Sequence, residues 1–499
     1  MPHVRFRALA ALALAFLLPA CGGGGSNEPF DPRGTFGVIA LEGADLPGPT
    51  VGQVGALPTG GGAGEPVMAI ASGGWSAAVV PTTNGTVPWI VMVLDPSGDQ
   101  VEALAAGAPI PSLVDGTMDD VSRLWITGDG HVVAYVAIAG NTEGRTWALL
   151  SVEVDGGAAA APVHLASELM GLGSVLLPGV MRSLDPADVA VDDNGQVWFL
   201  AGNDSDDPVL FSVPVDGSSL AVHAHPGDSL PGAVTLVEIK SFGVEPAGTR
   251  FAIVGGASDA SDRLVTGVPG GLSFDPIAAT GDSLFGGGVI ADLHVGDPLL
   301  VYGGNNVVWH ARGSLSASDD LLLIGSPLAG EILARRGGPA ASTGGGTYGT
   351  LRLLHQEGDA SIPYFAASIV GSGNGTTFGL YGVTSPTEAA ELAVGVGRSI
   401  AGTTIGTTFP SLDRPPLQAA ARNGDLAFAN VLADARSGVF WLIPFTAFVG
   451  AAISGESTPI GDTWAAFAPA AFVTTAESGI QWLGRLSTAG TDGLFRYVR

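Results

Sequence analysis

The sequence predicts an all-β protein built from about eight copies of one four-stranded unit. A glycine-centred turn recurs every 54 to 64 residues, and the segments between these turns alternate apolar and polar residues in short runs. No segment of the mature chain has the capped 3.6-residue period of a long helix. A period longer than one hairpin and shorter than one domain is typical of a repeat architecture.

The recurring turns, called landmark turns below, set the number of units. They are Gly43-Ala-Asp-Leu-Pro-Gly48, Gly107-Ala-Pro-Ile-Pro111, Met170-Gly-Leu-Gly173, Gly227-Asp-Ser-Leu-Pro-Gly232, Gly281-Asp-Ser-Leu-Phe-Gly286, Gly337-Gly-Pro339, Gly397-Arg-Ser-Ile400 and Gly455-Glu-Ser-Thr-Pro459. A mean spacing of about 59 residues divides residues 34–499 into about eight units. Seven units remain the alternative if the degenerate unit near Met170 or Gly337 is an insertion.

Each unit is expected to run in the same order. A polar crossover follows the landmark turn and leads into an inner strand. A second strand opens at a glycine turn, of which the clearest are Gly130, Gly195, Gly248, Gly424 and Gly479. A third strand follows, as in Val209–Val213, Phe378–Gly382 and Gly438–Leu442, and a fourth leads to the next landmark turn. Four strands per unit are typical of a propeller blade.

The two ends of the repeat complete each other. The chain finishes on a third-type strand, Gly493-Leu-Phe-Arg-Tyr-Val498, and Gly34–Leu41 is a strand with no blade before it. If the N-terminal strand completes the last blade, two exposed sheet edges disappear in one step. We therefore predict an eight-bladed β-propeller, closed by its N-terminal strand, as the single domain of residues 34–499.

Residues 1–20 are typical of a secretory signal peptide. His3, Arg5 and Arg7 precede an apolar run from Ala8 to Leu18, and this run is shorter than the roughly 20 residues that span a bilayer. Cys21 lies three residues after a leucine, so the segment resembles the signals of bacterial lipoproteins, in which this cysteine is acylated. The alternative is an ordinary signal peptide with Cys21 near the cut.

Lipidation would use the only cysteine of the chain. The mature domain would then have no disulfide, no thiolate nucleophile and no cysteine metal ligand. Residues 21–33, which contain Gly22-Gly-Gly-Gly-Ser26, are typical of a polar tether. In the lipoproteins that the signal resembles, an aspartate after the cysteine marks inner-membrane retention. Gly22 in its place implies the outer membrane, at its periplasmic face or at the cell surface.

Charge excludes several partners. Without residues 1–20 the chain has 18 cations against 47 acids, a net charge of −29. Such a surface repels nucleic acid and anionic lipid, so the acyl anchor must supply membrane attachment. An apolar content of 46% is high enough to bury a large core, which argues against disorder.

The repeat resembles a known family. Gly424-Asp-Leu-Ala-Phe428 and Asp192-Asp-Asn-Gly-Gln-Val-Trp-Phe199 are similar to the tandem-repeat family of secreted bacterial proteins built on an N-x-x-G-x-x-A-F unit. The resemblance covers most of residues 34–499 but is degenerate, because the asparagine of the motif is Ala421 in one unit and Asp192 in another. It implies an anchored extracytoplasmic repeat protein and no reaction.

The strongest candidate for a site is the polar lining of the predicted central channel, where the inner strands face the axis. The lining residues are Asp120, Arg123, Arg182, Asp185, Asp188, Glu238, Lys240, Asp292, His294, Arg352, His355, Asp413 and Arg414. Opposed charges that converge in a tunnel would attract a small polar ligand. The alternative is that these residues pair with one another and with channel water.

No cofactor is predicted, although two groups of residues raise a metal as an alternative. Asp192, Asp193 and Asn194, with Asn203, Asp204, Asp206 and Asp207, gather oxygen ligands of the kind that calcium takes, without the spacing of an EF-hand. His223 and His225 share one side of a strand near Asp228 and could bind a transition metal. The interpretations that involve no metal are a solvated acidic turn for the first group and two unrelated histidines for the second.

The sequence contains no catalytic motif. There is no G-x-S-x-G elbow and no P-loop, and no G-x-G-x-x-G run opens a helix. We interpret the tryptophans as core packing, about one per blade: Trp75, Trp125, Trp147, Trp198, Trp309, Trp441 and Trp482. The N-x-[ST] triplets at Asn84, Asn203 and Asn374 carry no information in a bacterial lipoprotein.

Two functions fit these features. The favoured one is a non-catalytic binding or scaffold propeller, anchored in the outer membrane, that engages another envelope or extracellular protein or a polymer. In layout the chain resembles the eight-bladed lipoprotein of the outer-membrane barrel-assembly machinery. The tryptophan-docking repeat A-x-D-x-x-T-G-x-x-x-W of that family is absent, so its function does not carry over. The alternative is a hydrolase or lactonase-like propeller enzyme with a divalent ion in the channel.

Overall fold

The structure, a computed structural model, covers most of the predicted domain. It describes residues 35–57, 67–172, 179–271, 273–284, 287–293, 295–296, 299–302, 306–326, 329–354, 356–357, 363–383, 390–400, 403–406, 418–421, 425–443, 447–465, 467, 473–476, 479–488 and 490–498. The predicted signal peptide and tether, with Cys21, lie outside these ranges.

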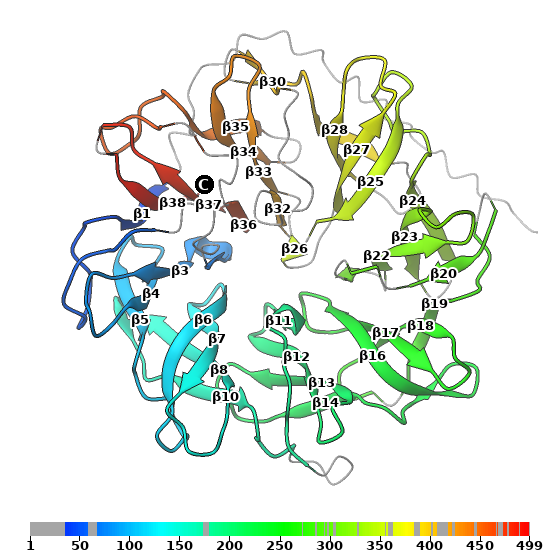
Figure 1. The fold of residues 1–499 in the computed structure, drawn as a ribbon, viewed down its shortest axis with the longest axis horizontal. Coiled ribbons are helices and arrows are strands. Elements are labelled where there is room, and N and C mark those ends of the chain that lie inside the picture. Colours follow the sequence, from blue (N-terminus) through cyan, green and yellow to red (C-terminus); the bar gives the residue numbers. More distant parts are fainter. Residues whose placement is uncertain are drawn as a thin grey trace, which may run out of the picture.

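Eight antiparallel sheets follow one another around a ring, which confirms the eight-bladed propeller (Figure 1). Two short 3-10 turns, η1 (Ser72–Gly74) and η2 (Pro186–Asp188), interrupt the strands. The strands of each blade are given from the inner to the outer one. Blade 1 consists of β2 (Met68–Ile70), β3 (Ser76–Pro81), β4 (Trp89–Leu94) and β5 (Gln100–Ala105), and blade 2 of β6 (Thr117–Ile126), β7 (His131–Ala139), β8 (Trp147–Asp155) and β10 (Val163–Ser167), with β9 (Ala158–Ala159) on β8. Blade 3 consists of β11 (Val189–Val191), β12 (Gln196–Gly202), β13 (Pro208–Pro214) and β14 (Ala221–Ala224), and blade 4 of β16 (Val234–Val244), β17 (Phe251–Ala257), β18 (Asp262–Gly267) and β19 (Asp275–Ala279), with β15 (Ser229–Leu230) on β16.

Blades 5 to 8 continue the ring, and the units near Met170 and Gly337 are blades rather than insertions. Blade 5 consists of β20 (Ile290–Asp292) and β21 (Leu300–Tyr302), which share the inner position, β22 (Asn306–Gly313), β23 (Asp320–Ser326) and β24 (Ala329–Arg335). Blade 6 consists of β25 (Thr347–Leu353), β27 (Tyr364–Val370), β28 (Phe378–Gly382) and β29 (Glu391–Gly395), and blade 7 of β32 (Gln418–Ala421), β33 (Leu426–Val431), β34 (Ser437–Ile443) and β35 (Ala447–Ile453), with β26 (Gln356–Glu357) parallel to β32. Blade 8 consists of β36 (Val473–Ala476), β37 (Gly479–Arg485), β38 (Asp492–Val498) and β1 (Thr35–Leu41). A separate hairpin joins β30 (Ser399–Ile400) to β31 (Thr403–Thr404).

The N-terminal strand closes the ring as predicted. β1 pairs antiparallel with β38, from Thr35 opposite Val498 to Leu41 opposite Gly493. The last blade therefore takes three strands from the end of the chain and its outermost strand from the beginning. This arrangement makes the first and last described segments of the chain neighbours in one sheet.

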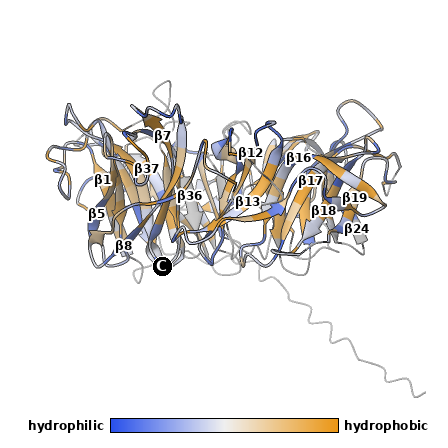
Figure 2. Cartoon of the chain, turned by 90° about the horizontal axis from the view of Figure 1, so that it is seen from below, coloured by the Kyte–Doolittle hydropathy of each residue, from blue (hydrophilic) through white to orange (hydrophobic). Residues whose placement is uncertain are grey.

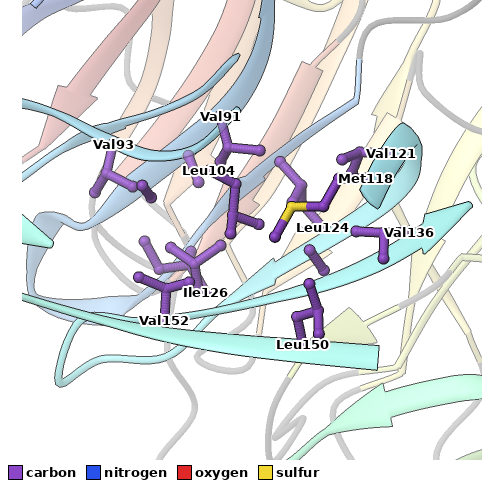
Figure 3. Packing of buried hydrophobic residues seen from close by; sticks show 14 of the residues in the cluster. Val91, Val93, Leu104, Met118, Val121, Leu124, Ile126, Val136, Leu150 and Val152 are labelled. Atoms are coloured by element: carbon purple, nitrogen blue, oxygen red, sulfur yellow. The ribbon is translucent and has the colours of Figure 1, made fainter. Parts of the chain in front are cut away.

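The core of the molecule is a ring of eight seams between blades. Each of eight apolar clusters joins two consecutive blades, and the last of them joins blade 8 to blade 1 through Ile39, Leu494 and Met92. Figure 3 shows the seam between blades 1 and 2, where Val91 packs near Met118. Because a neighbour covers both faces of every sheet, strands such as β4 are apolar and buried along their whole length.

The landmark turns form the same hairpin in all eight units. The backbone N–H of the landmark residue donates to a carbonyl 8 to 12 residues further on, and the next N–H closes a β-turn onto the end of the fourth strand. These landmark hairpins are 43–54, 107–118, 169–181, 227–236, 281–290, 337–348, 397–405 and 455–464. Every one ends on a buried apolar residue: Val54, Met118, Met181, Leu236, Ile290, Tyr348, Ile405 or Trp464.

The landmark glycine is needed for its backbone angle. Seven of the eight landmark residues are glycines with φ between 76° and 99°, and a Cβ added to any of them would meet nothing within 4 Å. The third unit has Leu169 at this position, with φ of 60°. The predicted landmark turn, Met170-Gly-Leu-Gly173, therefore starts one residue too late, because the prediction relied on a glycine in the turn.

This assignment predicts opposite effects of two glycine substitutions. Gly107→Ala should destabilise the fold by about 1 to 2 kcal/mol, because an L-residue is strained at positive φ. Gly171→Ala should be neutral or slightly stabilising, because Gly171 has no positive φ and its Cβ would also meet open space. Urea unfolding midpoints of the two variants measure the difference. A smaller loss for Gly107→Ala than for Gly171→Ala would contradict the assignment.

Strand order divides the surface into two faces. The first strand of a blade starts at its landmark hairpin, so antiparallel pairing puts the turns between second and third strands on the same side. We call this side the landmark face. The turns between first and second strands and between third and fourth strands form the opposite face, and Figure 2 shows the ring edge-on between the two.

The outer edge of every blade carries a β-bulge. In all eight sheets the fourth strand has one residue without a partner in the third strand. A bulge twists an edge strand and hinders pairing with another chain. The bulged residues are Ala103, Leu165, His223, Ile277, Leu333, Ala393, Ala451 and Ile39, so blade 3 alone has a polar residue there.

Candidate functional site

Most of the predicted lining residues lie on the inner strands or directly before them. Asp120 and Arg123 are on β6, Glu238 and Lys240 on β16, Asp292 on β20 and Arg352 on β25, whereas Arg182, Asp185 and Asp188 precede β11. His294, His355, Asp413 and Arg414 lie outside the described residues. Inner strands such as β6 and β11 surround the ring axis (Figure 1).

Lys240 forms ion pairs inside blade 4. Its Nζ lies 2.8 Å from Oδ1 of Asp262 and 3.5 Å from Oε1 of Glu238. Glu238 and Asp262 are both in register with Gly256, whose missing side chain lets them approach across β17. The hydrogen bond to Asp262 raises the pKa of Lys240, so the ammonium stays charged and paired.

Arg182 is likewise paired within its own blade. Its Nη2 lies 3.0 Å from Oδ1 of Asp204, which belongs to the turn between the second and third strands of blade 3. Both partners are about half exposed, so this ion pair contributes little to stability. The cations Arg182 and Lys240 therefore serve local pairs and do not converge on a shared ligand position.

Arg123, Asp185 and Asp188 come together between blades 2 and 3. Burial and the nearby Asp185 raise the pKa of Asp188 to about 6, against the effect of Arg123. Asp185 accepts from the N–H of Ala187 at 2.8 Å and so begins the short turn that carries Asp188. A carboxyl group that titrates near pH 6 can donate or accept a hydrogen bond at the axis, which makes this trio the candidate polar site.

Two aromatic side chains of blade 2, Trp125 and Tyr135, lie beside this trio. The Arg123 guanidinium lies 5.5 Å from the ring centre of Trp125, and the hydroxyl of Tyr135 donates to the carbonyl of Leu184 at 3.0 Å. Burial, with the charge of Asp185, raises the pKa of Tyr135 to about 12. Tyr135 therefore stays protonated and holds the segment before β11 against blade 2.

His223 and His225 have separate partners. His223 stacks on Trp198 with ring centres 4.4 Å apart, and its Nε2 lies 2.8 Å from the Ser212 hydroxyl. His225 instead approaches Asp228 at 3.2 Å through Nε2. Within the described residues, no three His, Cys, Asp or Glu side chains gather closely enough to hold a metal ion.

His223 predicts acid sensitivity. Burial lowers the pKa of its imidazole from 6.5 to about 4, so between these values the unfolded chain binds a proton that the folded chain does not. Stability is therefore full above pH 6.5 and falls by about 2 to 3 kcal/mol as the pH drops towards 4. His223→Leu, which restores the apolar bulge residue of the other blades, should remove this loss.

The comparison of the two proteins isolates His223, because Asp188 acts in the opposite direction. The raised pKa of Asp188 makes the fold gain stability as the pH falls from about 6. Urea midpoints of wild type and His223→Leu should therefore diverge steadily from pH 7 to pH 4. Parallel pH profiles would contradict a buried, neutral His223.

The acidic blade 3 turn uses its carboxylates for structure. Oδ1 of Asp192 accepts from the N–H groups of Asn194 and Gln196, and Oδ2 accepts from the indole N–H of Trp198 at 2.9 Å. Asn203 in the next turn accepts from two backbone N–H groups. Because their oxygens already accept hydrogen bonds, Asp192 and Asn203 are poor calcium ligands. The divalent ion in the channel, on which the alternative function depends, stays a prediction.

The sequence analysis missed a second series of repeated residues. Six blades begin the turn between second and third strands with an Asn or Asp side chain that accepts from the N–H two residues on: Asn84, Asn141, Asn203, Asp259, Asn374 and Asp434. Three of these are the asparagines of the N-x-[ST] triplets. Their spacing near the 54 to 64 residue period was the signal that could have identified them.

The tryptophans are mostly core residues, as predicted. Trp198, Trp441 and Trp482 are on strands and almost fully buried, whereas Trp75 precedes β3 and is only half-buried. The sequence analysis did not include Trp464, whose ring lies 4.8 Å from that of Phe495 at the centre of the seam between blades 7 and 8.

No family model matches the chain, and no curated protein matches it. Solved structures similar to it include an acylaminoacyl peptidase from Pyrococcus horikoshii (9% identity, 74% of this chain, 51% of that chain, TM-score 0.39). The BP39L lectin from Burkholderia pseudomallei has 12% identity over 78% of this chain and 99% of that chain, with a TM-score of 0.37. The β-propeller domain of Myceliophteria thermophila Cps50 (Swd1) has 8% identity over 87% and 96%, with a TM-score of 0.32. Identities this low carry no activity over to this chain. Among the described residues, no helix is long and apolar enough to cross a membrane.

Proposed function

We propose that this chain is an outer-membrane lipoprotein whose propeller binds a partner protein and catalyses no reaction. The lipobox-like Leu18-Pro-Ala-Cys21, followed by Gly22, supports the anchor and its address. The absence of a catalytic motif from the sequence supports the binding role.

The unequal distribution of exposed apolar side chains between the two faces carries this proposal. Among the described residues, seven of the nine exposed large apolar side chains are on the landmark face, and only Val163 and Val268 are on the opposite face. The seven are Val51, Val114, Val237, Val289, Leu315, Val370 and Ile460. The face with more exposed apolar side chains is the better candidate for an interaction surface.

Site-specific photo-crosslinking tests the binding role. A photoreactive residue replaces Val51 or Val114 on the landmark face, or Val163 or Val268 on the opposite face, in the lipidated protein within intact cells. We expect a discrete protein adduct from the landmark face that an unrelated acidic lipoprotein does not form. The absence of an adduct from all four positions would contradict the binding role.

The anchor has its own test. Cys21→Ser should move the protein from the outer-membrane fraction to the soluble fraction and abolish incorporation of labelled fatty acid. Ser26→Ala, in the tether, is the matched control and should change neither result. Membrane recovery of the Cys21→Ser protein would contradict lipid anchoring.

A further inference from the structure

The first two landmark hairpins each carry a strongly exposed apolar side chain. Val51 is 83% exposed and Val114 is 61% exposed, compared with 36% for Val163 and 40% for Val268 on the opposite face. The two hairpins lead into neighbouring blades, which share one apolar seam. The indole N–H of Trp89 in blade 1 also donates to the carbonyl of Asp119 in blade 2 at 2.9 Å, which fixes the second hairpin against the first blade.

Carboxylates without a cation lie on the same two hairpins and directly after the second. Asp45 is in the first landmark hairpin, Asp115 is in the second, and Asp119 follows on β6. None of the three takes part in an ion pair among the described residues, although Asp45 accepts a hydrogen bond from Gln53 at 3.3 Å. This part of the face therefore combines exposed apolar side chains with uncompensated negative charge.

The cations of the landmark face do not neutralise this charge. Six of them each have a carboxylate oxygen within 3.0 Å: Arg145 with Glu143, Arg182 with Asp204, Lys240 with Asp262, Arg263 with Asp259, Arg335 with Asp319 and Arg436 with Asp434. Since these partners belong to the same blade, the cations are not free to bridge to the first two hairpins.

The charge identifies the occupant. A second copy of this chain, with a net charge of −27, would bring like charges together at a contact of this kind. Nucleic acid and anionic lipid are disfavoured for the same reason. A protein segment that alternates cationic and apolar side chains complements both features of the surface.

The position of β1 leaves this surface accessible. Thr35 pairs with Val498 at the end of the third strand of blade 8, so β1 starts on the opposite face. The chain that precedes β1 therefore joins the ring at the opposite face and not at the landmark hairpins.

We infer that the landmark hairpins of blades 1 and 2, with Val51, Val114, Asp45, Asp115 and Asp119, dock a basic protein segment on the face of the ring opposite the start of β1. This inference rests on the proposed function, because it assigns the surface and the partner chemistry of that binding role. The two valines supply apolar contact, and the carboxylates select cationic side chains and accelerate association.

A defined peptide tests the inference. The probe is a labelled ten-residue peptide of alternating arginine and valine, and the lipidated protein is held in phosphatidylcholine vesicles. We expect saturable binding that weakens as salt rises from about 50 mM to about 500 mM, because salt screens exposed charges. A peptide of alternating arginine and serine should bind at least about fivefold more weakly, because it offers no apolar side chain.

Paired variants locate the binding surface. Val51→Ser with Val114→Ser should weaken binding at least about fivefold, and Asp45→Asn with Asp115→Asn at least about threefold at low salt. The controls on the opposite face, Val163→Ser with Val268→Ser and Asp99→Asn with Asp155→Asn, should stay within about twofold of wild type.

Each contrary outcome has one meaning. Equal losses in the opposite-face controls, or equal binding of the arginine–serine peptide, would overturn the inference. No binding of either peptide would overturn it too, and the crosslinking experiment would then decide the proposed function separately. A protein adduct from Val163 or Val268 alone would keep the binding role and move it to the other face.

Discussion

Deletion of Thr35–Leu41 should abolish the stable fold even when residues 1–34 are kept. β1 supplies Ile39 and Ala40 to the seam between blades 8 and 1, and Phe36 packs 5.9 Å from Phe495 in the seam between blades 7 and 8. Large buried side chains contribute about 1.5 to 3 kcal/mol each and hydrogen bonds about 0.5 to 1.5 kcal/mol each. The summed loss is on the order of 10 kcal/mol, which matches the whole stability of a typical domain.

The shortened protein should aggregate or be cleaved by protease, first in blade 8, where Leu483 and Leu494 would become exposed. Limited proteolysis followed by mass spectrometry identifies the first cut. Deletion of residues 22–27 is the matched control, and its melting temperature should equal that of the wild type. Equal melting temperatures for the two deletions would mean that β1 does not hold the ring closed.

The blade count could be predicted because it depends on local backbone geometry. A turn that needs positive φ selects glycine wherever it occurs, so seven landmark turns were visible as glycines in the sequence. The closing strand could be predicted because an unpaired strand stood at each end of the repeat. Leu169 was not predicted as a landmark residue because a residue other than glycine adopts the positive φ there, at some cost in strain.

The pairing register within each blade, and the side-chain contacts that depend on it, could not be predicted in the same way. The bulged residue of each fourth strand depends on the register between two strands, and one residue of slip would assign it differently. The sequence therefore left a metal ligand as an alternative for His223, which occupies the position that Leu165 and Ile277 fill in other blades. Nine of the residues predicted to line the channel lie on the inner strands or directly before them, and the lining itself stays a prediction. Their partners within each blade depend on turns that only the folded chain brings close.

The contacts of Arg496 could not be predicted from the sequence either, and they lead to the second large expected effect. Arg496 is 1% exposed, and its guanidinium donates to the carbonyls of Gly74, Leu94 at 2.8 Å and Asp95 at 2.6 Å. It thereby joins β38 of blade 8 to blade 1, about 400 residues away in sequence. Burial lowers the pKa of Arg496 to about 10, yet the side chain stays charged at neutral pH.

The closing seam alone has this residue. At the same register position of the third strand the other blades have Val93, Ser151, Ser212, Thr266, Ile324, Gly382 and Trp441. The other seams join segments that are consecutive in the chain, whereas the closing seam must form between its two ends. A charged group with several backbone acceptors selects one register for this contact, because any slip would leave the buried charge without partners.

Arg496→Ala should therefore lower the free energy of unfolding by about 3 to 5 kcal/mol, because it leaves a cavity and removes the donors of three carbonyls. Arg496→Met should cost less, about 0 to 2 kcal/mol, because it fills the space and removes a buried cation. Ser151→Ala is the matched control at the same position of blade 2. The Ser151 hydroxyl has no partner among the described residues, so this change should be neutral within about 0.5 kcal/mol. Urea unfolding gives the free energies, and hydrogen exchange should show the loss of protection concentrated in β38, β1 and β4. Loss of protection spread evenly over the eight blades, or a wild-type midpoint for Arg496→Ala, would mean that closure depends on the strand pairing of β1 alone.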